Sequence, residues 1–220
     1  MAKTVLEYDE RNARWLLLCG VIAPLVVVLF MVIAWLLTPG YSHLSETVSQ
    51  LGANGKPHPE VMNTGFILFG ILVNCFAYGL YRKLGRGRGA KAVWVLLGIF
   101  GTGIILSGIF QSDLGPEMFT SLEDTLHSVF STIAFFGLQI GMVVFARIVY
   151  FNPSWHTFAL ISLSIAVLNV VLSLVFLLEI SNQVEGVLQR MFYGTSVLWL
   201  EMVALRLLCL KPSGVSIADA

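Results

Sequence analysis

The chain has 220 residues, of which 57% are hydrophobic and only 12% are charged, and its mean hydropathy is +0.84. An ordinary soluble domain is about 45–50% apolar and about 25% charged, so this composition excludes a typical soluble protein and indicates one embedded in lipid. Thirteen basic and thirteen acidic residues leave a formal net charge of zero, which excludes the basic footprint of a nucleic-acid-binding protein.

Six apolar segments are each close to the roughly 20 residues that a membrane-spanning helix needs. None shows the alternation of period two that is typical of membrane β-barrel strands. We therefore predict an all-α bundle of six transmembrane helices in one domain, residues 15–210, between tails at 1–14 and 211–220. The predicted helices cover about residues 15–38, 61–81, 92–110, 126–146, 157–178 and 187–209.

Basic residues are distributed unequally between the two sides of this membrane domain. Eleven of the thirteen lie before the first helix, between the second and third, after the fourth, or at the end of the sixth; only Lys56 and Arg190 lie on the other side. Because basic residues are retained in the cytoplasm, we expect a multi-pass protein of the plasma membrane with both termini cytoplasmic. Eight of the thirteen acidic residues then face outside.

One ionisable residue, Glu201, falls inside the predicted hydrocarbon region. A carboxylate there must face the bundle, become protonated or pair with a donor. Asn74 and Gln139 lie at a similar depth on helices that run in the same direction, so the three side chains are predicted to form an interhelical hydrogen-bond network. The alternative is a proton or cation site at Glu201.

The connection between the first two helices is rich in polar residues. Its apolar residues Leu44, Val48 and Leu51 recur at spacings of four and three, which predicts an amphipathic helix lying on the outer leaflet. The opposite face of that helix would present its polar residues, which include Ser42, His43, Ser45, Glu46, Ser49 and Gln50.

Further polar residues are predicted at the outer ends of three helices. Asp113 follows the third helix, Asp124 and His127 lie one turn apart near the start of the fourth, and Arg190 lies near the start of the sixth. Ion pairs such as Asp113 with Arg190, or Asp124 with His127, would tie these ends together.

Histidine and carboxylate are also the residues of catalytic zinc sites and of general acid–base catalysis. His43, His58 and His127 are all predicted outside, but no ligand-spacing motif such as HExxH is present. A serine nucleophile near His127 is a further alternative, although the sequence has no nucleophile elbow of the GxSxG type.

The order of short motifs along the chain supports a family resemblance. The segments are Ser49-Gln-Leu-Gly-Ala, Gly108-Ile-Phe-x-x-Asp113, Leu126-His127, and Gln189-Arg190 followed by Trp199. In this order they resemble the bacterial and archaeal membrane proteins called domain of unknown function 998, over about residues 15–210. The resemblance implies a six-helix integral membrane protein whose polar motif matches Ser49, Asp113, His127 and Arg190, and it implies no activity.

A more distant similarity is to metal-dependent membrane hydrolases that include alkaline ceramidases. Those enzymes carry two histidines on a final helix, whereas the sixth helix here has none and offers Arg190 instead.

Three hypotheses about function follow. In the first, the outer face binds a lipid headgroup or other amphiphile: Arg190 contacts an anionic group, His43 and Glu46 lie beside it, and Asp113, His127 and Ser49 complete the pocket. In the second, the same site hydrolyses or transfers a lipid-like substrate, with His127 as general base and Asp113 orienting it or binding a metal. In the third, Glu201 serves a small proton-coupled transporter. The residues identify no cofactor and no oligomeric state.

Overall fold

The computed structural model describes residues 2–85, 87–114, 120–178 and 183–209, with side chains from Arg14 onward except that of Leu177. Six long helices and one short 3-10 helix make up this part of the chain, and it contains no strand. The elements are α1 (Ala2–Leu36), η1 (Ser49–Gly52), α2 (Pro59–Lys83), α3 (Arg88–Ile109), α4 (Leu122–Val149), α5 (His156–Leu177) and α6 (Glu185–Cys209).

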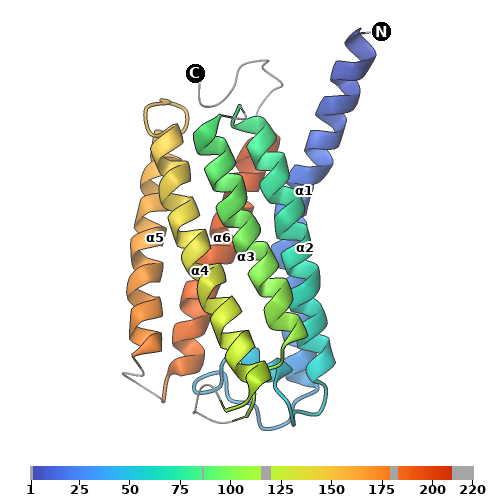
Figure 1. Ribbon diagram of the computed structural model, residues 1–220, viewed down its shortest axis with the longest axis vertical. Helices are drawn as coiled ribbons and strands as arrows, with labels where there is room; N and C mark the ends of the chain where they lie inside the picture. Colours follow the sequence, from blue (N-terminus) through green and yellow to red (C-terminus); the bar gives the residue numbers. More distant parts are fainter. Residues whose placement is uncertain (1, 86, 115–119, 179–182, 210–220) are drawn as a thin grey trace.

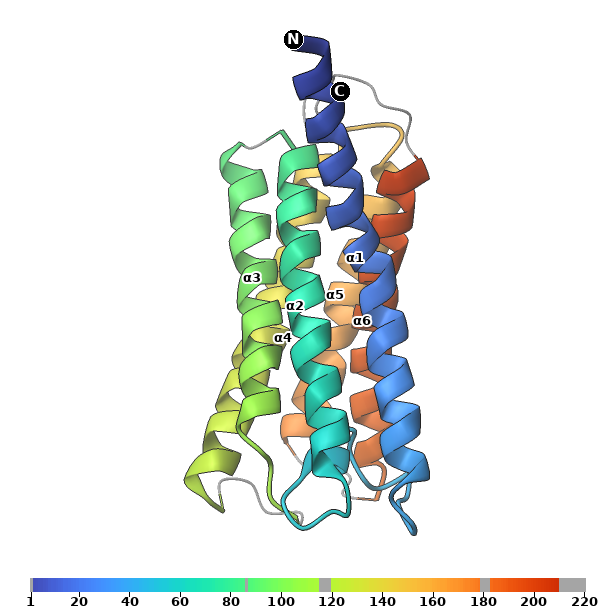
Figure 2. The same cartoon turned by 90° about the vertical axis from the view of Figure 1, so that its right-hand side faces the viewer.

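The helices form a closed ring in which each packs against the next in sequence and α6 returns to α1 (Figure 1, Figure 2). Aromatic side chains fill the interior. Phe69 of α2 packs edge-on against Phe100 of α3 at 6.0 Å between ring centroids, and Phe100 packs against Phe135 of α4 at 5.6 Å. Phe145 of α4 packs against Trp199 of α6 and extends this aromatic core toward the C-terminal ends of both helices. Edge-to-face geometry is the arrangement that aromatic quadrupoles favour.

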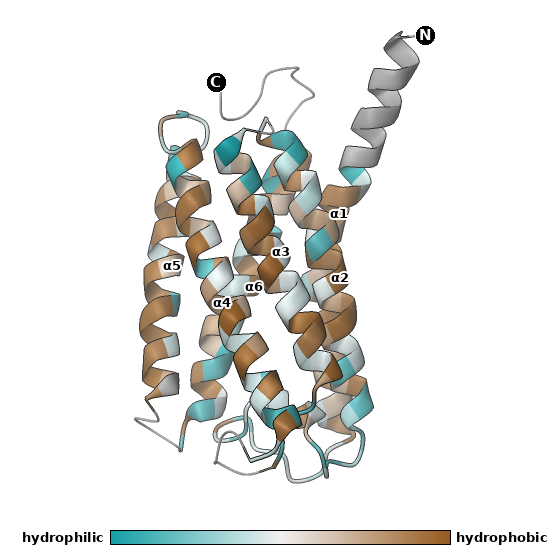
Figure 3. Cartoon of the chain, viewed as in Figure 1, coloured by the Kyte–Doolittle hydropathy of each residue, from teal (hydrophilic) through white to brown (hydrophobic). Residues whose placement is uncertain are grey.

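All six helices are long and apolar enough to cross a membrane. Their outward faces remain apolar, and hydrophilic residues gather toward the two ends of the bundle (Figure 3). Because lipid offers no hydrogen-bond partners, a helix that satisfies its own backbone is the favoured way for such a chain to cross a bilayer. The structure therefore confirms the predicted all-α, six-helix, multi-pass membrane architecture.

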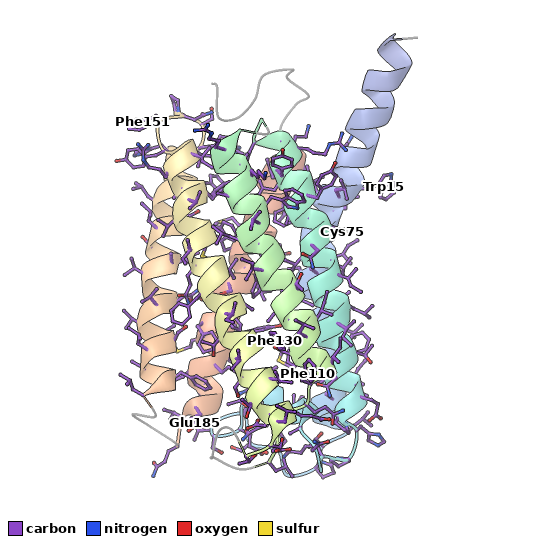
Figure 4. The ribbon with its side chains drawn as sticks, viewed as in Figure 1. Trp15, Cys75, Phe110, Phe130, Phe151 and Glu185 are labelled. Carbon is purple, nitrogen blue, oxygen red and sulfur yellow. The ribbon has the colours of Figure 1, made fainter. Side chains whose placement is uncertain are left out.

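The two ends of the bundle differ in what they carry. One end, called here the terminal end, holds the start of α1 and the end of α6. The other, called the mouth end, holds the connections α1–α2, α3–α4 and α5–α6. Most of the basic residues belong to the terminal end, where Trp15 projects from α1 and Phe151 lies beyond α4 (Figure 4).

Helix α1 begins at Ala2, so residues 2–14 of the predicted tail are helical, while the part of α1 that is apolar enough to span a membrane begins at Arg14. Residues 2–14 contain neither Gly nor Pro and include several strong helix formers, so the membrane helix continues toward the N-terminus without a new nucleation step. The backbone of this extension rises beyond the other helices (Figure 2). The predicted C-terminal tail, 211–220, lies outside the described residues.

The predicted network of Asn74, Gln139 and Glu201 does not form among the described residues. Asn74 donates to the Gly70 carbonyl of its own helix, and Gln139 donates to Ser173 Oγ of α5 at 3.1 Å. Glu201 has no hydrogen bond to any described residue. Side chains of α4 and α6 meet through aromatic residues such as Phe145 and Trp199, so equal depth alone does not bring the three polar side chains together.

The polar contacts within the membrane region follow α5 instead. Ser162, Asn169 and Ser173 lie on one face of that helix, because residues spaced by seven and four stack along a helix. Asn169 Nδ2 donates to Ser196 Oγ of α6 at 2.9 Å, and Trp199 Nε1 donates to Ser162 Oγ at 2.8 Å. With the Gln139 bond, these contacts attach α5 to both of its neighbours.

We expect the Asn169–Ser196 pair to stabilise the α5–α6 contact. A double-mutant cycle of Asn169→Ala and Ser196→Ala, followed by unfolding in mixed micelles, should give a coupling free energy of about 0.6–1.7 kcal/mol, the range for membrane interhelical hydrogen bonds. A cycle of Asn74→Ala with Ser196→Ala is the control and should give almost none. Equal coupling in the two cycles would contradict the assignment.

Candidate functional site

A cavity of about 160 Å³ opens at the mouth end, between α3, α4, α5, α6 and the α1–α2 connection. On α4 and α6 the polar lining residues lie near the mouth end and the aromatic lining residues lie deeper in the bundle. Along α4 the lining proceeds from Asp124 and His127 through three hydroxyl residues to Phe135 and Phe136. Along α6 it proceeds from Glu185 and Gln189 to Phe192 and Tyr193. On these two helices the rim is polar and the floor aromatic, whereas on α5 Phe176 lies nearer the mouth end than Ser173.

The rim is partly built by residues 41–52, called here the strap. The predicted amphipathic helix over this segment is wrong: the strap consists of turns followed by the short helix η1. Val48 is 2% exposed and Leu51 1%, so both are buried in the bundle, whereas Leu44 is 54% exposed. The apolar spacing reflected burial against the helix ends rather than contact with lipid.

Internal hydrogen bonds explain why the strap is not helical. The Tyr41 hydroxyl lies 2.7 Å from the Thr47 carbonyl oxygen, to which it donates, and Ser42 and Thr47 donate their amides to side chains of Glu46 and Gln50. Side-chain groups that bind nearby backbone in this way compete with helix formation.

Helix α6 holds the strap in place through Gln189 and Arg190. Gln189 Oε1 accepts the Val48 amide at 2.5 Å. Arg190 Nη1 lies 3.0 Å from the His43 carbonyl oxygen, 2.9 Å from that of Glu46 and 2.7 Å from that of Gly186, and Nη2 donates to the Tyr41 hydroxyl. These contacts join segments about 140 residues apart in the chain.

The strap packs so closely on the start of α6 that a side chain at Gly186 would not fit. A Cβ atom at Gly186 would lie 2.4 Å from the Glu46 carbonyl oxygen and 2.7 Å from that of His43. This position therefore requires glycine for close approach of two backbones.

Arg190, His43 and Glu46 do lie together, but none of the three lines the cavity. The guanidinium donates to carbonyl oxygens and to the Tyr41 hydroxyl, so the described contacts of Arg190 are with the protein, and its contact with an anionic ligand group stays a prediction. His43 is exposed and packs its ring against Trp35 and Tyr41. The three residues fix the strap.

Glu46 forms an ion pair with Lys56, the other basic residue at this end. Partial burial raises the pKa of Glu46, but hydrogen bonds from Lys56 and the Ser42 amide, together with the charges of Lys56 and Arg190, more than offset this effect. The net result is a pKa below the ordinary carboxyl value.

Asp113 lies on the rim, after the end of α3, and it bonds to neither Arg190 nor any other basic residue in the described part of the chain. Its carboxylate accepts the Thr120 hydroxyl at 2.7 Å and the Asn54 amide at 3.4 Å. Hydroxyl donation by Ser121 and Thr120 lowers the pKa of Asp113. The predicted Asp113–Arg190 pair is therefore wrong.

Asp124 holds the entry to α4. Its two carboxylate oxygens accept the backbone amides of Asp113 and Thr120, and its own amide donates to the N-cap residue Ser121. An acidic residue in the first turn of a helix is favoured by the helix dipole. The predicted Asp124–His127 pair is not among these contacts, because His127 faces α3.

His127 is only 7% exposed and lines the cavity. Its Nδ1 lies 2.8 Å from the Ser107 carbonyl oxygen and 3.0 Å from that of Phe110. A carbonyl oxygen can only accept, so Nδ1 carries the hydrogen, and in the neutral ring Nε2 is an acceptor. No described residue donates to Nε2.

Ser49 also lines the cavity, but it does not bond to His127. Its hydroxyl lies 3.0 Å from that of Thr47 and 3.4 Å from Gln189 Nε2. The Ser112 hydroxyl donates to the Ser49 carbonyl, which fixes η1 to the end of α3. In this arrangement His127 does not activate Ser49.

The three histidines expected at this end separate in the structure. His43 packs in the strap, His58 pairs with Glu60 on the surface, and His127 faces the cavity. Among the described residues, no group of three or more His, Cys, Asp and Glu is placed to hold a metal ion.

The floor of the cavity contains a polar atom that the sequence did not identify. The Tyr193 hydroxyl is buried without a hydrogen-bond partner among the described residues, and its ring packs against Phe69 and Phe135. Gln139 Oε1, one turn deeper on α4 than Phe135, is similarly buried without a partner. The sequence gave no sign of this role for Tyr193, because a tyrosine near the end of a membrane helix is common and belongs to no motif there.

We expect Arg190→Lys to loosen the strap, because a lysine ammonium lacks the planar fork that reaches several oxygens at once. The free energy of unfolding should fall by about 1.5–3 kcal/mol, and residues 42–51 should become more sensitive to protease. Gly186→Ala should have the same proteolytic effect while it retains Arg190. Arg147→Lys, at the exposed terminal end, is the control and should change little. A protected strap in both mutants would contradict this role.

The Glu46–Lys56 pair predicts acid sensitivity. Because the folded-state pKa of Glu46 is lowered, its contribution to stability is complete above the ordinary carboxyl pKa of about 4.5 and is lost as the pH falls through the lower folded value. The free energies of unfolding of the parent and of Glu46→Gln should therefore differ at pH 7 and converge as the pH falls through that lower folded value. A difference that does not change with pH would contradict the assignment.

Comparison with known proteins agrees with this architecture. The family model described as Protein of unknown function (DUF998) matches residues 21–206, which include all six helices and the rim of the cavity. Searches of curated proteins and of solved structures find no match. On the strength of the family match over most of its length, the chain belongs to the DUF998 family of membrane proteins.

Proposed function

We propose that this protein binds a membrane amphiphile in the mouth-end cavity, with the polar head at the rim and part of the hydrocarbon chain at the aromatic floor. The observation that supports the proposal is the ordering of the lining with depth on two helices, from Asp124 and His127 to Phe135 on α4, and from Gln189 to Phe192 on α6. Sites of this kind combine apolar walls with a few placed polar groups.

The cavity volume limits what is enclosed. A cavity of about 150 Å³ holds a benzene ring, so the 160 Å³ here accepts a ring or a few methylene groups and not a whole lipid. The rest of the ligand must lie outside the cavity. Helices α4 and α5 separate toward the mouth end (Figure 1), and both contribute to the lining, so the chain would leave between them into the bilayer.

The same proposal includes an orientation. Eleven of thirteen basic residues belong to segments predicted on the cytoplasmic side, and those that the structure describes lie at the terminal end, so the positive-inside rule favours cytoplasmic termini and a mouth end outside the plasma membrane. A ligand would then reach the cavity from the outer leaflet.

A hydrolase or transferase at this cavity is the second candidate, and it rests on His127. An imidazole whose Nδ1 is fixed by two carbonyl oxygens presents Nε2 as a proton acceptor, which is the form that a general base requires. Turnover of a lipid-like substrate that is lost in His127→Asn, with folding retained, would favour this candidate over simple binding.

The binding proposal predicts that a bulky residue in the cavity wall displaces the ligand. Ser131 lines the cavity, and its hydroxyl bonds only to the Ser128 carbonyl of its own helix, so Ser131→Trp should fill the space at small structural cost. Co-purified amphiphile, measured by native mass spectrometry, should fall at least about 5-fold.

Ile133→Trp provides the matched control, because Ile133 lies two residues further along α4 on its exposed face. This variant should retain the ligand of the parent. Equal occupancy in the parent and both variants would place the amphiphile elsewhere, and a parent that binds no amphiphile would refute the proposal.

A further inference from the structure

The side chains on the cavity rim are rich in hydrogen-bond acceptors and poor in cations. Three of the described lining residues are carboxylates, Asp113, Asp124 and Glu185, and none is Lys or Arg. Figure 4 shows Glu185 at the mouth-end start of α6, at the same end as Phe110 and Phe130. The rim therefore combines carboxylate charge with neutral hydroxyl and amide groups.

The helix dipoles do not reverse this charge. Helices α4 and α6 begin at the mouth end, and each contributes about half a positive charge there, whereas α3 and α5 end there and each contributes about half a negative charge. Helix α2 also begins there and lines the cavity through Phe66, so the five lining helices together leave about half a positive charge, which is less than the charge of the three carboxylates. The carboxylates then determine the sign of the local potential.

The two basic residues of the mouth end are engaged elsewhere. Lys56 pairs with Glu46, and Arg190 is held by carbonyl oxygens of the strap and of α6. Neither lines the cavity. An anionic headgroup would therefore face carboxylates without a compensating cation.

His127 gives independent evidence about the ligand. It is 93% buried, and its Nδ1 is fixed on α3 carbonyl oxygens, so the polar atom that it can offer the cavity is the acceptor Nε2. Within the described part of the chain, no donor satisfies that atom. This nitrogen is open to the cavity and is not among the fully buried atoms without a partner, so its hydrogen-bond donor comes from water or from a ligand.

From these observations we infer that the cavity selects an amphiphile whose head is a cationic hydrogen-bond donor, such as a primary ammonium group, over one with a phosphate or other anionic head. The ammonium donates to His127 Nε2 and lies in the field of the rim carboxylates. This inference rests on the proposed binding function and specifies its ligand class. It replaces the anionic head expected from the sequence.

Three probes with the same twelve-carbon chain separate charge from hydrogen bonding. Dodecylammonium carries charge and donors, dodecyltrimethylammonium carries charge alone, and dodecyl phosphate is anionic. Binding would be measured to the full-length protein in zwitterionic nanodiscs, with the signal of Ser131→Trp nanodiscs subtracted as the blank. We expect dodecylammonium to bind at least about 10-fold more tightly than dodecyl phosphate, with dodecyltrimethylammonium between them.

His127→Asn tests the acceptor, because the asparagine amide retains a donor near the position of Nδ1 and lacks Nε2. Its affinity for dodecylammonium should fall about 10-fold, the loss expected for one hydrogen bond to a charged group. His156→Asn is the matched control: His156 Nδ1 also contacts a carbonyl oxygen, that of Tyr150, but at the terminal end. It should bind all three probes like the parent.

Asp113→Asn provides a second variant that keeps the shape of the rim. Removing one negative charge should reduce the preference for dodecylammonium over dodecyl phosphate by about 3-fold. This outcome does not depend on the folding of the His127 variant.

The failures of the two proposals are distinguishable. If the three probes bind the parent equally above the blank, or dodecyl phosphate binds most tightly, the ammonium inference is refuted and amphiphile binding stands. If no probe binds above the blank, both proposals are refuted.

Discussion

The mouth end of this protein depends on one guanidinium group. Arg190 lies where the strap crosses the start of α6, and it donates to the carbonyl oxygens of His43 and Glu46, which belong to no helix or sheet. Buried backbone carbonyls need hydrogen-bond donors, and the planar, permanently charged guanidinium supplies several donors from one side chain. With the strap fixed, Val48 can be buried, Ser49 can reach the rim, and the cavity has a wall on that side.

Deeper in the bundle, the helices are held together by close side-chain packing and a few hydrogen bonds between side chains, and not by contacts to backbone carbonyls. Between helices in lipid the hydrophobic effect contributes little, so packing and polar contacts determine which helices associate. Aromatic edges fill the centre of the ring, and the polar face of α5 fixes its two neighbours. The cavity occurs at the mouth end, where α4 and α5 separate and this packing stops.

Much of the architecture was predictable from the sequence, because the hydropathy of a segment indicates whether lipid or water surrounds it. The five helices from α2 to α6 begin and end within about four residues of their predicted bounds, whereas α1 extends further because nothing in residues 2–14 stops a helix. Depth along each helix was also predictable from its length. The direction of each polar side chain was not, and for that reason Asn74 and Gln139 were predicted to meet Glu201, whereas Asn74 bonds within α2 and Gln139 bonds to α5.

In the candidate site, too, the position of residues along the chain was predictable but their partners were not. Ser49, Asp113 and His127 were predicted at the mouth end, and all three line the cavity. Arg190 was assigned either to Asp113 or to an anionic ligand group, because its planar fork donates bidentately to carboxylate and phosphate. Its partners are backbone carbonyls of a segment more than 140 residues away, and a sequence gives no direct sign of backbone acceptors. The tautomer of His127 likewise follows from carbonyl positions that only the fold defines.

The distance along the chain between the strap and its anchors has a consequence for biosynthesis. Tyr41 and Val48 are made early, but Gln189 and Arg190 are among the later residues to leave the ribosome. Contacts of such high sequence separation form late, because the chain between their ends must first be ordered. Until α6 is inserted beside α1, the strap lacks the partners that hold it, so a nascent chain of five helices would contain most of the bundle without a finished mouth.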